Sequence, residues 1–322
     1  MLTFLLALAC APLPTKGDRH DWALADVRAI AWAGDNSAVV AGTASGEIVI
    51  WNARSGRELV RWKSDKGLVA LSLRGDTLVS GSERGRIEVW HWRTGKLVKA
   101  FPTAENLRSL CLHPDGKSVA TASDVHAARW DTATGKEIQS IAYDNLNQTG
   151  RCISHSPDGE LLLLSTGSRT LPDGKRFDSW SMMTDLEGKG RNLSLGTSCD
   201  VHVVVDRVGL PSVRTEWDPD NRSWVHDTGG GLLHVQDRAI TCREIHGSNV
   251  VGFAHSSHHK LWVAARANGQ IEVASRKNWT VWHPVTNLGP VEHFVLSPDG
   301  KRFAVANERR VMLRSLPKEP AR

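Results

Sequence analysis

Three histidines lie close together in the sequence: His255, His258 and His259. Imidazole nitrogen binds zinc, but a zinc site needs further ligands, and no cysteine or acidic residue lies at a suitable spacing from this group. His258 and His259 also stand where other segments of the chain carry an Asp-Gly turn. We therefore interpret them as part of a solvated turn and predict no metal site.

The motifs that carry common enzymatic chemistry are missing from the sequence. It has no GxSxG nucleophile motif, no HExxH zinc motif, no Walker loop, and no GxGxxG at a strand-to-helix turn. Gly229-Gly230-Gly231 lies between two strand-like runs, which favours a turn over a phosphate-binding loop. The pairs Asp178/Asp185 and Asp218/Asp220 could act as acid and base, but aspartate is ordinary in turns. We predict neither an enzyme nor a bound cofactor.

Arginine recurs at one place in the pattern of the chain and offers a binding chemistry. Arg28, Arg108 and Arg151 each stand at the first position of a short apolar run. The corresponding residues of other runs are Val69, Val251 and Glu292. If these runs line one channel, three guanidinium groups meet at its mouth, where they offer paired donors to a carboxylate or phosphate. The hypothesis is capture of an acidic or phosphorylated segment of a partner protein; the alternative is that these arginines are simply solvated strand ends.

A second basic segment is the loop Thr166–Asp178, which exceeds the repeat described below. Its charged residues include Arg169, Lys175 and Arg176. Repeat proteins place specificity in loops that exceed the repeat length. The loop is therefore a second candidate for partner binding, and the alternative of a loop without a partner stays open.

The elements that must position these residues follow from Asp26–Trp62, the clearest copy of a repeating unit. Four apolar runs, RAIAW, AVVAG, EIVIW and ELVRW, alternate there with turn residues. Runs of about five residues that are rich in Val, Ile and Trp are typical of half-buried antiparallel strands. Four such strands joined by tight turns form a meander, and a lone meander cannot bury both of its faces. It needs copies of itself.

The copies return at a period near 40 residues. Trp51 recurs as Trp90 and Trp130, and the turn at Gly56 recurs at Gly95 and Gly135. A second turn marker begins at four prolines, Pro114, Pro157, Pro219 and Pro298, and Ser257–His259 fills the slot between the last two. Four strands in each unit of this length predict the blade of a β-propeller.

On these residues the chain resembles the WD40-repeat β-propeller family, over essentially everything after residue 18. The best instance is LHPDGKSVATAS followed by ARWDTATGKEI, and Trp130-Asp131 is a literal Trp-Asp pair. The Gly-His dipeptide of the family is essentially missing, and Ser45, Arg84 and Asn268 replace its usual turn aspartate. We therefore expect that the family's His–Asp–Ser–Trp network is not built and that apolar packing holds the blades together. The resemblance implies a scaffold for protein–protein interaction.

The expected fold is all-β: a single seven-bladed β-propeller of four-stranded antiparallel blades over residues 18–317, followed by a tail at 318–322. Blade seven offers three strands after Gly289, and residues 20–26 (HDWALAD) form a spare strand. Adding this N-terminal strand to the last blade closes the ring and removes exposed edges. Six or eight blades are the less favoured counts. The hardest segment to place is Ser198–Gly209, whose VHVVVD is a candidate outer strand.

Composition and the N-terminus limit the partners and the compartment. A net charge of +5 over 322 residues without a long Lys/Arg run does not indicate nucleic-acid binding. Residues 1–17 resemble a secretory leader, are too short to span a bilayer, and have small residues before Cys10 as at a lipoprotein cleavage site. We expect an exported monomer, periplasmic, extracellular or lipid-anchored at Cys10, without a transmembrane segment; a cytoplasmic protein with a misassigned start is the alternative. The alternative function is an exported propeller enzyme or ligand-binding protein that uses the channel mouth.

Overall fold

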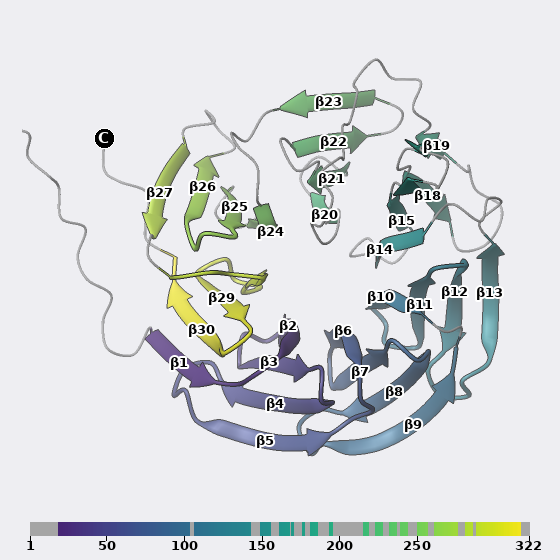
Figure 1. Ribbon diagram of the computed structural model, residues 1–322, viewed down its shortest axis with the longest axis horizontal. Helices are drawn as coiled ribbons and strands as arrows, with labels where there is room; N and C mark the ends of the chain where they lie inside the picture. The colour runs from purple at the N-terminus through teal and green to yellow at the C-terminus, as the bar shows by residue number, and fades with distance from the viewer. Residues whose placement is uncertain are drawn as a thin grey trace, which may run out of the picture.

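Short apolar runs separated by Gly, Asn and Asp turns form strands throughout the computed structural model of the protein. It describes residues 19–103, 106–142, 149–155, 161–167, 169–170, 176–177, 181–185, 193–195, 215–218, 223–227, 232–236, 239–243, 250–256, 261–275, 281–285 and 288–316. Within these residues the strands form seven four-stranded antiparallel sheets and one two-stranded sheet. Figure 1 shows the sheets set around a common centre, each running from an inner to an outer strand.

Three consecutive sheets come from the N-terminal part of the chain and have their strands in sequence order. The first contains β2 (Val27–Trp32), β3 (Ala38–Thr43), β4 (Glu47–Asn52) and β5 (Glu58–Lys63). The second contains β6 (Leu68–Arg74), β7 (Thr77–Ser82), β8 (Arg86–His91) and β9 (Lys96–Pro102). The third contains β10 (Leu107–Leu112), β11 (Ser118–Ser123), β12 (His126–Asp131) and β13 (Glu137–Ala142).

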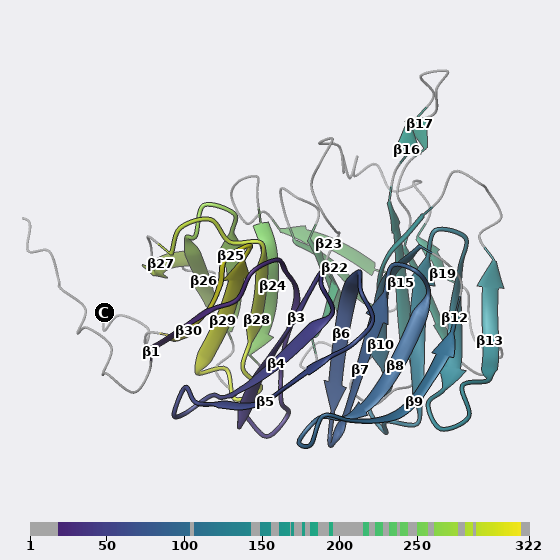
Figure 2. The same cartoon turned by 60° about the horizontal axis from the view of Figure 1, so that its bottom comes forward.

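The next sheet is interrupted by a hairpin. It contains β14 (Thr149–His155), β15 (Leu161–Gly167), β18 (Ser181–Asp185) and β19 (Leu193–Leu195). Between β15 and β18 the chain forms a separate two-stranded sheet of β16 (Arg169–Thr170) and β17 (Arg176–Phe177). This hairpin falls in the predicted insertion Thr166–Asp178, and Figure 2 shows it standing away from the other sheets.

Three further sheets complete the set. One contains β20 (Thr215–Asp218), β21 (Ser223–Asp227), β22 (Leu232–Gln236) and β23 (Ala239–Arg243). Another contains β24 (Val250–Ser256), β25 (Leu261–Arg266), β26 (Ile271–Ser275) and β27 (Val281–Val285). The last has the order β1-β30-β29-β28, from β1 (Arg19–Ala23), β30 (Arg310–Ser315), β29 (Arg302–Asn307) and β28 (His293–Leu296).

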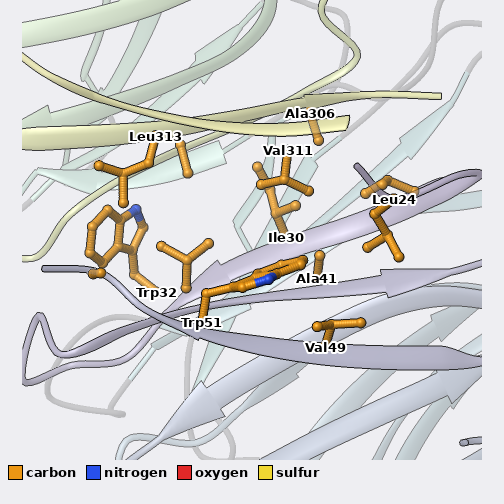
Figure 3. Close-up of a cluster of buried hydrophobic side chains, with 13 residues drawn as sticks. Leu24, Ile30, Trp32, Ala41, Val49, Trp51, Ala306, Val311 and Leu313 are labelled. Atoms are coloured by element: carbon orange, nitrogen blue, oxygen red, sulfur yellow. The ribbon is translucent and has the colours of Figure 1, made fainter. Parts of the chain in front are cut away.

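Each sheet can pack against two neighbouring sheets, because successive side chains along a strand point to opposite faces. On β4, Val49 and Trp51 face the last sheet, while Ile48 and Ile50 face the second sheet. Figure 3 shows the first of these contacts, with Leu313 and Val311 of β30 near Trp51. Each inner strand also lies next to the inner strand of the following sheet, and β28 lies next to β2.

The strand β1 joins the last sheet through side chains as well as through the backbone ladder, which pairs Arg19 with Arg314 and Ala23 with Arg310. The largely buried guanidinium of Arg314 donates to the Asp21 carboxylate at 2.7 Å. Trp22 stacks on Trp51 of the first sheet with ring centroids 4.7 Å apart, and its indole N–H donates to the Gly56 carbonyl at 2.8 Å. The N-terminal strand therefore contacts both the last and the first sheet.

Networks of side-chain hydrogen bonds also stabilise the sheets. They differ from the His–Asp–Ser–Trp network that is typical of the WD40 family. In the second sheet the Trp90 indole donates to Ser80 Oγ at 2.9 Å, Ser80 Oγ lies 2.9 Å from Ser64 Oγ, and Ser64 donates to buried Glu88 at 2.6 Å. In the third sheet the Trp130 indole donates to Thr121 at 2.9 Å. Apolar clusters do span neighbouring sheets, as expected, and two serines and a glutamate add a polar network at the second sheet.

Several predicted features lie outside the described residues. They are the leader 1–17, the segment Ser198–Gly209 with its VHVVVD, the glycines 229–231, His258 and His259, and the tail 318–322.

Candidate partner-binding site at the ends of the inner strands

Five inner strands share an irregularity at the position that the sequence analysis singled out. The ladder between the first and second strand shifts by one residue across Arg28, Val69, Arg108, Arg151 and Val251. The extra residue of a β-bulge is unpaired in the ladder and its side chain is re-aimed. Because β2, β6, β10, β14 and β24 hold equivalent places in their sheets, these residues lie at one end of the inner strands.

We call this end the rim and define it by Arg28, Val69, Arg108, Val251 and Glu292. Glu292 stands one residue before β28 and takes the equivalent place in the last sheet. Arg28, Arg108 and Glu292 are exposed, whereas Val69 and Val251 are half-buried. The rim therefore combines two cationic groups, one acidic group and apolar side chains.

Arg108 is held in place by a bidentate ion pair. Its Nε and Nη2 donate to the two carboxylate oxygens of Asp124 at 2.8 and 2.9 Å. These hydrogen bonds raise the pKa of the Arg108 guanidinium, while partial burial opposes the rise. The Arg108 side chain is still 40% exposed, so it remains accessible to a partner. An acidic ligand at this position must either displace Asp124 from Arg108 or bind Arg108 while the ion pair with Asp124 stays intact.

The Arg28 side chain makes no hydrogen bond within the described residues and lies close to Glu292 of the last sheet. Partial burial raises the pKa of the Glu292 carboxyl; the carboxylate of Glu308 adds to the rise and the charge of Arg28 opposes it. Since Arg28 acts on Glu292, the two side chains share one region of the rim. Arg28 offers the more available guanidinium of the two whose surroundings are described.

The remaining predicted residues are only partly placed. Arg151 occupies the bulge of β14, Arg169 lies on β16 and Arg176 on β17. The side chains of these three residues, and all of Lys175, lie outside the described residues. The structure thus brings Arg28 and Arg108 to the same rim and leaves the other four as candidates.

Asp124 lies next to the rim, where it pairs with Arg108, and the sequence analysis missed it. It follows β11, at the turn between the second and third strand of its sheet, where the other repeats carry Ser45, Arg84 and Asn268. Aspartate at this one turn was a signal available in the sequence. Comparing the four turns directly would have placed a carboxylate near the start of β10, where Arg108 lies.

The described residues give no sign of a metal centre or a membrane span. Among them, no group of three or more His, Cys, Asp or Glu side chains is arranged to hold a metal ion. No helix in that part of the chain is both long enough and apolar enough to cross a bilayer.

Comparison with known proteins identifies the fold. No protein-family model and no curated protein matches the sequence. Among solved structures, the crystal structure of the β-propeller domain of Cps50 (Swd1) from Myceliophteria thermophila matches with a TM-score of 0.74 and 12% sequence identity. The match covers 92% of this chain and 98% of that chain. The chain has the β-propeller fold.

Within this propeller each four-stranded sheet is a blade. We number as blades one, two and three the sheets that begin with β2, β6 and β10, and as blade four the sheet that begins with β14. The sheet β1-β30-β29-β28 is the last blade. The inner strands are set around a common centre (Figure 1), and the rim is the end of these strands that carries the bulges.

Proposed function

We propose that this propeller is a non-enzymatic scaffold that binds an acidic or phosphorylated segment of another protein at the rim. One observation carries the proposal: Arg28 and Arg108 stand in ladder bulges at the same end of the inner strands, which we take as one mouth of a central channel. A guanidinium binds a carboxylate or phosphate through paired donors, and both arginines are exposed. Val69 between them supplies an apolar surface for the backbone of an extended segment.

The scaffold role also rests on a ring of seven blades closed by β1, which we propose as the full architecture. Its support is the run of seven four-stranded sheets, the place of β28 beside β2, and the pairing of β1 with β30. In a ring of this kind the inner edge strands are short and are protected by the neighbouring inner strands, so its loops are held rigidly enough to present a binding surface. Membership of the WD40 family is part of the same proposal and rests on the repeat pattern.

Affinity capture with the full chain tests the proposed function. The wild type and an R28A/R108A/R151A variant are used as baits, and the captured proteins are identified by mass spectrometry and then measured against each bait. Hydrogen bonds to charged groups contribute about 1.5–3 kcal/mol each, so affinity should fall roughly tenfold or more for each arginine that contacts the partner. A folded triple variant that keeps the wild-type affinity removes the proposal.

Two single variants sharpen the test at blade three. Asp124→Asn removes the charge that competes for Arg108 and should strengthen binding of an acidic segment, whereas Arg108→Ala should weaken it. Arg93→Ala is the matched control, because Arg93 is also an exposed, ion-paired arginine but contacts Asp35 and Asp76 beyond the other ends of β2 and β6. Equal losses for R93A and R108A would contradict a site at the rim.

We further propose that residues 1–17 are an export leader and that the mature protein acts outside the cytoplasm. The apolar run that ends in small residues before Cys10 supports this. N-terminal sequencing of the protein purified from its own cells decides it, since a mature chain that begins at Met1 contradicts export.

A further inference from the structure

Equivalent residues meet at each described boundary between consecutive blades. The residue before the repeated tryptophan of one blade packs near the fourth residue after the inner-strand bulge of the next. At the boundary of blades one and two the pair is Ile50 and Leu73, and at that of blades two and three it is Val89 and Leu112. Leu313 and Trp32 take the same roles between the last blade and blade one. All three pairs are apolar.

The boundary between blades three and four breaks this rule. By the same count its pair is Arg129, which precedes Trp130, and His155, which is the fourth residue after the bulge at Arg151. His155 is only 6% exposed, and neither of its ring nitrogens has a hydrogen-bond partner among the described residues. In the same part of the chain, the Nε of Arg129 is also buried without a partner. Three polar nitrogens therefore lie unsatisfied where the other boundaries hold aliphatic or aromatic side chains.

The groups around His155 are mostly cationic. Burial, and after it the charges of His113, Arg129 and Arg74, together lower the pKa of His155 to about 3, and the charge of Asp115 opposes them. His155 is therefore a neutral imidazole that carries one N–H. The ring of His113 meets it edge-on with centroids 5.0 Å apart. Asp115, the carboxylate on this side, lies 2.6 Å from His113 Nδ1 and accepts the Lys117 backbone N–H at 2.8 Å.

These charges decide which kind of ligand suits the boundary. A metal ion is disfavoured because two guanidinium groups act on His155 and because the described residues contain no cluster of three metal ligands. An oxyanion is favoured because it accepts hydrogen bonds and balances the permanent charge of Arg129. Buried polar groups in proteins are nearly always satisfied, so the two buried donors, Arg129 Nε and the single N–H of His155, call for an acceptor.

We propose that the boundary between blades three and four binds a small oxyanion, of the carboxylate or phosphate class, which accepts hydrogen bonds from Arg129 Nε and from the N–H of His155. The site lies at the C-terminal end of β14, which is the end away from the rim. It is independent of the proposed partner binding. Its role is to satisfy a blade boundary that side chains alone leave unsatisfied.

Thermal unfolding of the full chain at pH 7 tests the proposal. Inorganic phosphate and acetate are titrated separately, with ionic strength held constant by sodium chloride. The Tm of the wild type should rise with the concentration of at least one of the two, and which one acts identifies the class. The R129V/H155L variant restores the apolar pair of the other boundaries and should lose this rise. No rise beyond that of sodium chloride with either anion, or an equal rise in R129V/H155L, overturns the proposal.

A second readout keeps the test decisive if the double variant does not fold. The side-chain ¹⁵N signals of the histidines are followed by NMR in the wild type during the same titrations, and His155 is assigned from a His155→Gln variant. Saturable movement of the His155 signals supports the site. Movement of other histidine signals with His155 unchanged overturns it. Arg57→Val, which removes an exposed cation that belongs neither to the rim nor to this boundary, is the control variant and should keep the full response to the anion.

Discussion

Replacing His155 by leucine should remove a large part of the acid sensitivity of the propeller. His155 is buried at the boundary of blades three and four, and burial lowers its pKa from 6.5 to about 3. The folded chain therefore binds this proton much more weakly than the unfolded chain does. Stability from the neutral imidazole is complete above pH 6.5 and is lost as the pH falls toward 3.

The size of the effect follows from the two pKa values. Over the whole window the shift corresponds to about 5 kcal/mol of unfolding free energy. Between pH 7 and pH 5 the expected loss is about 2 kcal/mol, because the unfolded chain takes up the proton in that window and folded His155 stays almost unprotonated. The carboxyls of Asp35, Asp115 and Asp299 have lowered pKa values, so their titration falls below this window.

Urea unfolding followed by tryptophan fluorescence at pH 7 and pH 5 measures the effect, in buffers that contain neither phosphate nor a carboxylic acid. Leucine occupies the equivalent places at Leu73 and Leu112, so H155L should fold. The difference in free energy between H155L and the wild type should grow by about 2 kcal/mol from pH 7 to pH 5. His155→Gln, which is polar but does not titrate, should show the same change. A difference that stays constant within about 0.5 kcal/mol would refute the reasoning.

Three further predictions concern stability and use the same unfolding assay. Trp22→Ala removes the stack on Trp51 and the hydrogen bond to the Gly56 carbonyl, and it should lower the free energy of unfolding by about 2–4 kcal/mol. Leu59→Ala, at an exposed position of an outer strand, is the control and should change it by less than about 0.5 kcal/mol. Glu88→Ala leaves the Ser64 hydroxyl and the Asp65 backbone N–H without their acceptor, and it should lower the free energy of unfolding by about 1–3 kcal/mol. A loss no larger than that of Arg86→Ala, which removes only the exposed partner of Glu88, would contradict this role. Gly46→Ala should cost more than about 1 kcal/mol, because Gly46 has a φ of 82° and a Cβ there would lie 2.5 Å from the Asp65 carbonyl oxygen; a neutral result would contradict that geometry.

Strand positions could be predicted because the repeat makes them redundant. The tryptophans at 51, 90 and 130 mark the third strands β4, β8 and β12, and the turn glycines at 56, 95 and 135 precede the outer strands. The spare N-terminal segment was matched to the sheet that lacked a fourth strand, and β1 pairs there with β30. In blade four the positions of β18 and β19 could not be predicted in this way, because they follow the insertion Thr166–Asp178, which breaks the period.

The candidate site was predicted in part. Arg28 and Arg108 were selected by position, but the bulges that re-aim them leave no mark in an alternating pattern, since one extra residue in a short run is not visible. The ion pair of Arg108 with Asp124 joins residues from neighbouring strands and is set by the register, which the sequence does not display. His155 and Arg129 were missed because each looks ordinary alone. Only a residue-by-residue overlay of the repeats shows that both stand at apolar positions.

The pairing of β1 with β30 has a consequence for how the protein is made. Arg19–Ala23 can find its ladder partner only after Arg310–Ser315 has been synthesised. Until then β1 cannot form its ladder hydrogen bonds, and Trp22 cannot have both Arg310–Ser315 and Trp51 beside it. The pairing of β1 with β30 is therefore a late step in the folding of this propeller.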